Sequence, residues 1–310
     1  MDDGYQSPFE SRAEDPDLQV PFVDELHYFS PSLTPLLSSA ELVLKITPEQ
    51  QVAFEVQQLY RYLDFTVRLE TEPVNEVALL LSRPAFIPWL HPGRRTDALT
   101  IYREEGKHAE WSKRQIDSVH AKTGVEPLDV DPAFLGELNH LIESEPESFG
   151  EFVKLFFVCV SETLIAGSLL NKLPRDEEVQ GAVRNLARAH AKEEGQHHKY
   201  FKSLFQQLWP ALPYQTSVRI GTLLPAMLRA FLLPDRSHML RVLETYAPDV
   251  KEADRIVDEI LKSEATADGL RTSATPSLRI FADAGVFGDP IISEAFLRNH
   301  FWLPEERAAS

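Results

Sequence analysis

Two short phrases of the sequence repeat one pattern of metal-binding residue types. Residues 104–108 read Glu-Glu-Gly-Lys-His, and residues 193–197 read Glu-Glu-Gly-Gln-His. An α-helix places positions i and i+3 on one face, so Glu105 can share a metal ion with His108, and Glu194 with His197. One Glu-x-x-His is weak evidence, because both residue types are common on exposed helices. Two of them on separate long helices indicate a dinuclear site, in which two further helices each supply one Glu.

Glu162 is the candidate from the third of these helices. It is the only charged residue in the apolar run Leu155–Leu170. A helix that is apolar on all sides is buried, and a buried carboxylate is costly unless it is paired, neutralised or bound to metal. A protonated Glu162 or an arginine partner would also explain it. The two Glu-x-x-His pairs favour a metal ligand.

The first helix offers three carboxylates, at positions 70, 72 and 76. One inward stripe steps along it by three or four residues: Leu59, Tyr62, Thr66, Glu70, Val74, Val77 and Leu81. Glu70 lies on this stripe and is the predicted ligand. Glu72 lies four residues after Arg68, which favours a surface ion pair between them, and Glu72 is therefore the alternative.

A further histidine lies on the fourth helix, one turn before its Glu-x-x-His pair. One continuous face contains Val183, Leu186, His190, Glu194, His197, Phe201, Leu204 and Leu208. A lone histidine on an apolar face is more often a satisfied core residue. Because two predicted ligands share this face, we expect His190 to point at the metal as well.

The donor types indicate which metal the site binds. Four carboxylates neutralise two divalent cations, and carboxylates with imidazole suit iron, or manganese as the alternative. No thiolate belongs to the set, which argues against structural zinc. We predict no catalytic residue beyond the ligands. The predicted metal ligands are Glu70, Glu105, His108, Glu162, His190, Glu194 and His197.

The elements that carry these residues are helices throughout, and strand signals are nearly absent. Helices are predicted over residues 47–82, 95–122, 148–172, 176–208, 215–233, 236–246 and 250–270. Pro73 should kink or split the first helix. The fold class is therefore all-α: a four-helix bundle over about 47–210 and substrate-pocket helices over about 211–310, the last 40 residues forming short helices and loops. We expect residues 1–40 to be a polar arm and residues 41–310 a single domain.

Charge and composition exclude some functions. The 310 residues contain 31 Lys and Arg against 48 Asp and Glu, a net charge of −17, which disfavours nucleic acid and anionic membranes as partners. The single cysteine, Cys159, excludes an intramolecular disulfide and fits a reducing compartment. No apolar signal segment opens the chain, and the most apolar run is too short to span a membrane. We expect a cytoplasmic location.

The sequence resembles the non-haem diiron N-oxygenases of the p-aminobenzoate N-oxygenase (AurF-like) type, within the ferritin-like superfamily. The resemblance rests on Glu105-x-x-His108, on the buried Glu162, and on His190-x-x-x-Glu194-x-x-His197 with its additional histidine. It is strong over residues 45–210. Where the family often has Ala, this chain has Gly106 and Gly195.

The resemblance implies a ferritin-like fold and an O2-dependent diiron oxidoreductase. Two iron ions would activate O2 and transfer oxygen to the nitrogen of an amine, with an aryl amine as the expected substrate, in a biosynthetic pathway. The products would be a hydroxylamine, nitroso or nitro compound. The partners expected are a small-molecule amine, O2, an external electron donor and, as a further option, a second copy of the chain in a homodimer. No flavin or nicotinamide fingerprint appears, so the electrons come from outside.

Two other readings remain open from the residues. The same site could hydroxylate or desaturate C–H bonds of a small molecule. Alternatively, the chain could be a non-catalytic metal-binding helical protein, although its roughly 100 residues after the bundle favour a covered substrate pocket.

Overall fold

Helices joined by loops and turns make up the described part of the chain. The computed structural model describes residues 5–9, 14–165 and 169–302, and within these ranges it contains no strand, only an isolated bridge between His27 and Val179. The all-α prediction is confirmed. Residues 166–168, which fall in the helix predicted over 148–172, lie outside the described part, as do parts of the predicted arm and the last eight residues.

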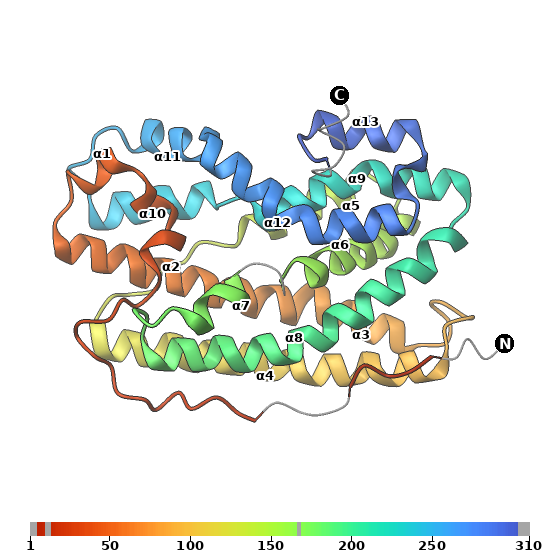
Figure 1. Cartoon of the computed structure of the whole chain (residues 1–310), viewed down its shortest axis with the longest axis horizontal. Helices are drawn as coiled ribbons and strands as arrows, with labels where there is room; N and C mark the ends of the chain where they lie inside the picture. Colours follow the sequence, from red (N-terminus) through yellow and green to blue (C-terminus); the bar gives the residue numbers. More distant parts are fainter. Residues whose placement is uncertain (1–4, 10–13, 166–168, 303–310) are drawn as a thin grey trace.

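Four helical columns form the bundle that holds the predicted ligands. They are α2 (Pro48–Leu69) with α3 (Asn75–Ser82), α4 (Pro92–Thr123), α6 (Gly150–Ile165) and α8 (Gly181–Leu208). The column α4 packs against α2, α3 and α8, and α6 packs against α8 and α3. Figure 1 shows α4 and α8 running side by side along one edge of the molecule, with the N-terminal arm beneath them.

Local signals set the ends of the bundle helices. At the start of α2, the Thr47 hydroxyl accepts from the Gln50 backbone N–H at 3.3 Å, and the Gln50 side chain accepts from the Thr47 N–H at 2.8 Å. This capping box satisfies two amides that a helix start leaves unpaired. α4 ends at Gly124, whose φ of 67° lies in the left-handed region that glycine tolerates best.

The start of α8 differs from the prediction of residue 176. The backbone before Gly181 pairs with the N-terminal arm instead: the His27 N–H donates to the Glu178 carbonyl at 2.8 Å, and the Gln180 N–H donates to the His27 carbonyl at 3.0 Å. The Gln180 side chain also donates to the Val23 carbonyl at 2.7 Å. These groups are therefore committed to a contact that is distant in sequence, and the helix begins later.

The first predicted helix is interrupted around Pro73: α2 ends at Leu69, and α3 begins at Asn75. A π-helical turn, Glu70–Val74, joins α2 to α3 and contains Pro73. A proline lacks the backbone N–H that an α-helix interior requires, and the wider turn accommodates that loss. The predicted disruption is real, but it takes the form of a wide turn that starts at Glu70.

The prediction was wrong in two other places. It missed α5 (Ala133–Glu143), which buries Phe134 and Leu138. The helix predicted over 250–270 is two helices, α11 (Ala253–Lys262) and α12 (Glu264–Asp283). They separate at Ser263, whose hydroxyl accepts from the Thr266 N–H at 3.1 Å and caps α12. The predicted short C-terminal helices are therefore preceded by a long one.

The remaining helices cover the bundle. Their bounds are α1 (Ala40–Val43), α7 (Leu169–Lys172), α9 (Tyr214–Leu232), α10 (Arg236–Tyr246) and α13 (Pro290–Arg298), with 3-10 turns at Pro31–Leu33, Pro35–Ser38, Glu147–Phe149, Leu173–Arg175, Trp209–Ala211 and Val286–Gly288. α9 packs against α5, α6, α12 and α13, and α10 packs against α2 and α11. The extra helices thus close one side of the bundle.

One helical stretch of the described chain, Tyr214–Tyr246, is long and apolar enough to cross a membrane by length and composition alone. It consists of α9 and α10, which are separated by Leu233–Asp235. Ile220, Leu224 and Met227 of α9 are fully buried in the core of the protein. A third of the most apolar window of this stretch is buried inside the protein, and the predicted cytoplasmic location stays a prediction.

Candidate metal centre

The seven predicted ligands lie together in the middle of the bundle, in two groups that share one residue. One group contains Glu70, His108, His190 and Glu194, and the other contains Glu105, Glu162, Glu194 and His197. Within each group, one ligand atom per residue lies within 4.8 Å of the others, and every residue is buried. Glu194 belongs to both groups, as a carboxylate bridging two ions would. The arrangement is that of a dinuclear site.

The buried oxygens of these carboxylates test whether a metal fits. Both side-chain oxygens of Glu70 and one each of Glu105, Glu162 and Glu194 have no hydrogen-bond partner among the described residues. Buried polar atoms are normally paired, and a buried anion without a partner is costly. Cations between the two groups would satisfy these oxygens together, so the donor set fits two metal ions.

Ring orientation distinguishes the three histidines. The Nδ1 atom of His108 lies 3.1 Å from a Glu105 oxygen, and the Nδ1 atom of His197 lies 3.0 Å from the other. Both rings therefore turn Nδ1 inward. His190 uses its other nitrogen: its Nε2 atom lies 3.0 Å from Glu70 Oε1 and 3.1 Å from Glu194 Oε1. All three histidines present a nitrogen to the carboxylates.

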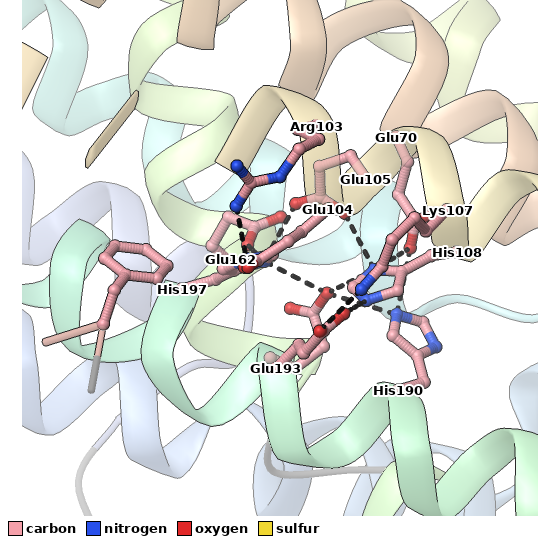
Figure 2. A network of polar contacts seen from close by, with 12 residues as sticks. Glu70, Arg103, Glu104, Glu105, Lys107, His108, Glu162, His190, Glu193 and His197 are labelled. Atoms are coloured by element: carbon pink, nitrogen blue, oxygen red, sulfur yellow. Dashed lines mark hydrogen bonds and ion pairs between the residues drawn. The ribbon is translucent and has the colours of Figure 1, made fainter. Parts of the chain in front are cut away.

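Two further glutamates orient two of these rings, and the sequence analysis did not assign them a role. The Nε2 atom of His108 lies 2.8 Å from Glu193 Oε2, and the Nε2 atom of His197 lies 3.1 Å from Glu104 Oε2. Each glutamate comes from the helix opposite to its histidine (Figure 2). A carboxylate on the outer nitrogen holds the proton there and leaves the inner nitrogen free to bind metal. The doubled Glu in both phrases was the available signal.

Two cationic side chains pair with these two outer glutamates. Lys107 Nζ lies 2.8 Å from Glu193 Oε1, and an Arg103 guanidinium nitrogen lies 3.5 Å from Glu104 Oε1. Burial raises the pKa of Glu193, but hydrogen bonds and charge from His108 and Lys107 outweigh burial. The resulting pKa of Glu193 is lowered to about 2. Glu193 is therefore a carboxylate that accepts hydrogen bonds at any ordinary pH.

Burial and neighbouring charges shift the pKa values of the predicted carboxylate ligands in different directions. Burial raises the pKa of Glu162 well above its usual range, and repulsion from Glu194 and Glu105 adds to the effect. Burial also raises the pKa of Glu70. For Glu194, burial acts in the same direction, but His197 and hydrogen bonds from three histidines outweigh it and hold its pKa well below the usual range. The bridging position thus carries the most stabilised negative charge.

The structure separates Glu70 from the other carboxylates of the first helix. Glu70 is 1% exposed and faces the cluster, whereas Glu72 pairs with Arg68 and Glu76 pairs with Lys154 at the surface. The choice of Glu70 over Glu72 therefore agrees with the geometry.

A cavity of about 360 Å³ lies against α2 and α6, two of the helices of the bundle, although none of the seven predicted ligands lines it. Its wall includes Tyr62 and Thr66 of α2 and Ile165 of α6, which lie within one or two turns of Glu70 and Glu162. Phe65, Phe134 and Phe231 add aromatic surface, and residues of α9, α10 and α12 close the cavity. This volume and lining suit a small aromatic molecule. The cavity lies between the bundle and the later helices, and its use as the substrate pocket stays a prediction.

The bundle and its two ligand groups define a ferritin-like protein with a site suited to two metal ions. The sequence model of the p-aminobenzoate N-oxygenase AurF family matches residues 12–285, which is most of the chain. The protein belongs to this family of oxygenases, and the resemblance noted from the sequence is confirmed. A comparison with curated proteins returns no match.

Proposed function

We propose that this protein is an O2-dependent oxygenase that uses two iron ions to N-oxygenate a small-molecule amine, for which an aryl amine is the best candidate. Membership of the p-aminobenzoate N-oxygenase family supports the reaction. The observation that carries the proposal is the position of His190, whose Nε2 lies 3.0 Å from Glu70 and 3.1 Å from Glu194. Of the three features that carry the resemblance, this additional histidine is the one that separates the N-oxygenases from other ferritin-like oxygenases.

The ligands divide between two ions around Glu194. Glu70, His108 and His190 would hold one iron, Glu105, Glu162 and His197 the other, and Glu194 would contact both. When bound, the two iron ions supply the reduction of O2 and the transfer of oxygen to nitrogen. Manganese is the alternative metal. Glu193 and Glu104 fix the rings of His108 and His197, so that the inner nitrogens are preorganised before metal arrives.

The chain excludes water from this reaction and orients the amine. The ligands are buried in a core that includes Phe157, Val158 and Tyr62. Burial, with the negative charge of Glu70 and Glu194 adding to it, raises the pKa of Tyr62 far above neutrality. The Tyr62 hydroxyl therefore keeps its proton. Because it has no partner among the described residues and its side chain lines the cavity, it can donate a hydrogen bond to a bound amine or to its oxidised nitrogen.

An anaerobic iron titration tests the proposal. The metal-free protein is loaded with about two ferrous ions per chain, oxygen is admitted, and the visible spectrum is followed with and without an aryl amine. We expect a transient absorption band that decays faster when the amine is present, and N-oxygenated products by mass spectrometry. Products oxidised only at carbon would instead favour a hydroxylase or desaturase. Uptake of metal without any oxygen reaction would favour a non-catalytic metal protein.

The variant His190→Ala tests N-oxygenation separately from metal binding. The variant keeps Glu70, His108 and Glu194 in its half of the site, so it should still take up metal. We expect altered decay of the optical band and loss of N-oxygenated product. An unchanged product yield would contradict the role proposed for His190. An external electron donor, a homodimer and a biosynthetic role also remain proposals.

A further inference from the structure

Besides Tyr62, Thr66 and Ile165, which neighbour the metal ligands in sequence, the cavity wall includes a polar group that lies further from Glu70 along α2. There the cavity is lined by Arg61 of α2, by Asp235 and by His238 at the start of α10. Arg61 precedes Glu70 by nine residues, which corresponds to roughly 13 Å along a helix axis. A molecule whose amine reaches the metal centre would therefore direct its opposite end toward these residues.

His238 is buried, and its ring has no hydrogen-bond partner among the residues that the structure describes. Its side chain lines the cavity and the residue is 5% exposed. Its backbone N–H donates to Asp235 Oδ1 at 3.1 Å, but no group of the described residues hydrogen-bonds either ring nitrogen. A polar group that faces a cavity and has no protein partner is usually satisfied by water or by a ligand. The ring is thus available to a molecule in the cavity.

The charges next to His238 are already satisfied by one another. Arg61 and Asp235 form a buried ion pair, and Arg61 also donates to the Val130 carbonyl at 3.1 Å. Asp235 Oδ2, the oxygen that pairs with Arg61, also accepts from the Ala133 N–H at 3.0 Å. The pair leaves no net charge. A carboxylate placed here would find Arg61 occupied and Asp235 repelling it.

His238 itself stays uncharged. Burial and then repulsion from Arg61 lower its pKa to about 4, against the opposing attraction of Asp235. At neutral pH the imidazole therefore offers one N–H donor and one nitrogen acceptor, without a positive charge. Gln58, another neutral side chain, lines the same cavity. Lys172 also lines it, but its side chain is exposed to solvent.

We propose that His238 determines substrate specificity: it binds the end of the substrate remote from the amine and selects an uncharged hydrogen-bonding group there, such as an amide, an ester carbonyl or a hydroxyl, over a carboxylate. This inference rests on the proposed function, because it assumes that the cavity holds the amine that is oxidised. The family is named for a carboxylate substrate, p-aminobenzoate. The cavity of this chain is better matched to a neutral analogue.

Two probes of nearly equal shape test the inference. p-Aminobenzamide and p-aminobenzoate differ at the remote end mainly in charge. We expect the full-length protein to bind the amide at least tenfold more tightly by titration calorimetry, in both the metal-free and the iron-loaded form. One lost hydrogen bond to a neutral group corresponds to about a tenfold change in affinity, which sets the scale.

Variants of His238 test whether this side chain causes the preference for the amide over the carboxylate. His238→Leu should weaken binding of the amide about tenfold and raise KM with little change in kcat, because the contact is made equally in ground and transition states. His238→Gln keeps a neutral donor and acceptor and should restore most of the affinity. His140→Leu, at an exposed histidine, is the matched control and should change neither value. Metal content should equal that of the parent in all three.

The opposite preference would overturn the inference. If p-aminobenzoate binds more tightly and Lys172→Gln removes that advantage, the exposed lysine recognises an anion and His238 does not select a neutral group. Equal losses for both probes in His238→Leu would likewise show that the residue does not discriminate by charge. Binding to the metal-free protein needs no turnover, so these outcomes are distinct from failure of the oxygenase reaction itself.

Discussion

Glu193 Oε2 lies 2.8 Å from His108 Nε2, although the two residues belong to different helices of the bundle. The same relationship recurs in reverse between Glu104 and His197, at 3.1 Å. Each ligand helix thus supplies a Glu-x-x-His pair to the inside and a carboxylate that orients the histidine of the other helix. The two helices cannot shift relative to one another without disturbing both inner nitrogens.

Removing one of these outer carboxylates should weaken the site without removing a ligand. Glu193→Gln and Glu104→Gln keep the side-chain shape but can present an N–H where the histidine needs an acceptor. We expect metal affinity to fall by roughly 10- to 100-fold in each, the range typical of such partners. Competition with a chelator measures it. Glu110→Gln, at an exposed glutamate that pairs with Arg114, is the control, and equal affinities in all variants would refute the role.

The variant Glu162→Gln separates the effect of metal binding on thermal stability from the effect of burying a carboxyl group. Burial makes the Glu162 carboxyl hard to ionise in the metal-free protein, so a neutral amide of the same shape should leave the metal-free melting temperature equal or higher. Metal stabilises a protein by about 2.7 kcal/mol at 100 times its dissociation constant, and the variant should lose most of that increment. Calorimetry with and without iron measures both. An undiminished increment would exclude Glu162 as a ligand.

The π-helical turn sets the rotation of Glu70 relative to α3. Deletion of the exposed Thr71 would favour ordinary α-helical spacing and rotate Glu70 by about 100° relative to residues after it. We therefore expect loss of stoichiometric metal binding or a marked drop in stability, measured by metal analysis and thermal unfolding. Thr71→Ala retains the residue count and should leave metal binding unchanged. A deletion variant that still binds two ions would show that the turn is dispensable.

Two glycine positions should respond to alanine in opposite directions. A Cβ at Gly106 in α4 meets nothing within 4 Å, so Gly106→Ala should stabilise the protein by about 0.5–1 kcal/mol without changing metal content. A Cβ at Gly221 in α9 would lie 2.4 Å from Ile292, so Gly221→Ala should destabilise it by about 1–3 kcal/mol. Denaturant unfolding compares the two. Similar effects at both sites would contradict the packing described between α9 and α13.

His238 should make stability depend on pH. Its pKa is lowered in the folded protein to about 4, from 6.5, so the unfolded chain binds the proton first. Above pH 6.5 the protonation of His238 does not lower the free energy of unfolding. As the pH drops from 6.5 toward 4, the free energy of unfolding falls by at most about 3 kcal/mol. Arg61 and Asp235 are the charged groups that act on it. The stability difference between the metal-free parent and His238→Gln, followed over this range, should shrink with falling pH; a constant difference would contradict the shift.

The sequence alone was sufficient for the features that depend on local geometry. Glu105 and His108, like Glu194 and His197, lie on one helix face because of helical spacing, which needs no tertiary information. Glu162 was identifiable because a single charge in an apolar helix must be buried. Glu70 required a choice among three carboxylates, and the stripe of inward residues indicated the one that faces the cluster.

The tertiary structure decided everything that depends on how the helices meet. The pairing of Glu193 with His108 depends on the distance and rotation between α4 and α8, which no local periodicity contains. The late start of α8 comes from backbone groups taken by the distant His27. The cavity, and the position of the His238 ring in its wall, arise only when α2 and α10 pack together, because burial is a property of the whole fold rather than of any segment.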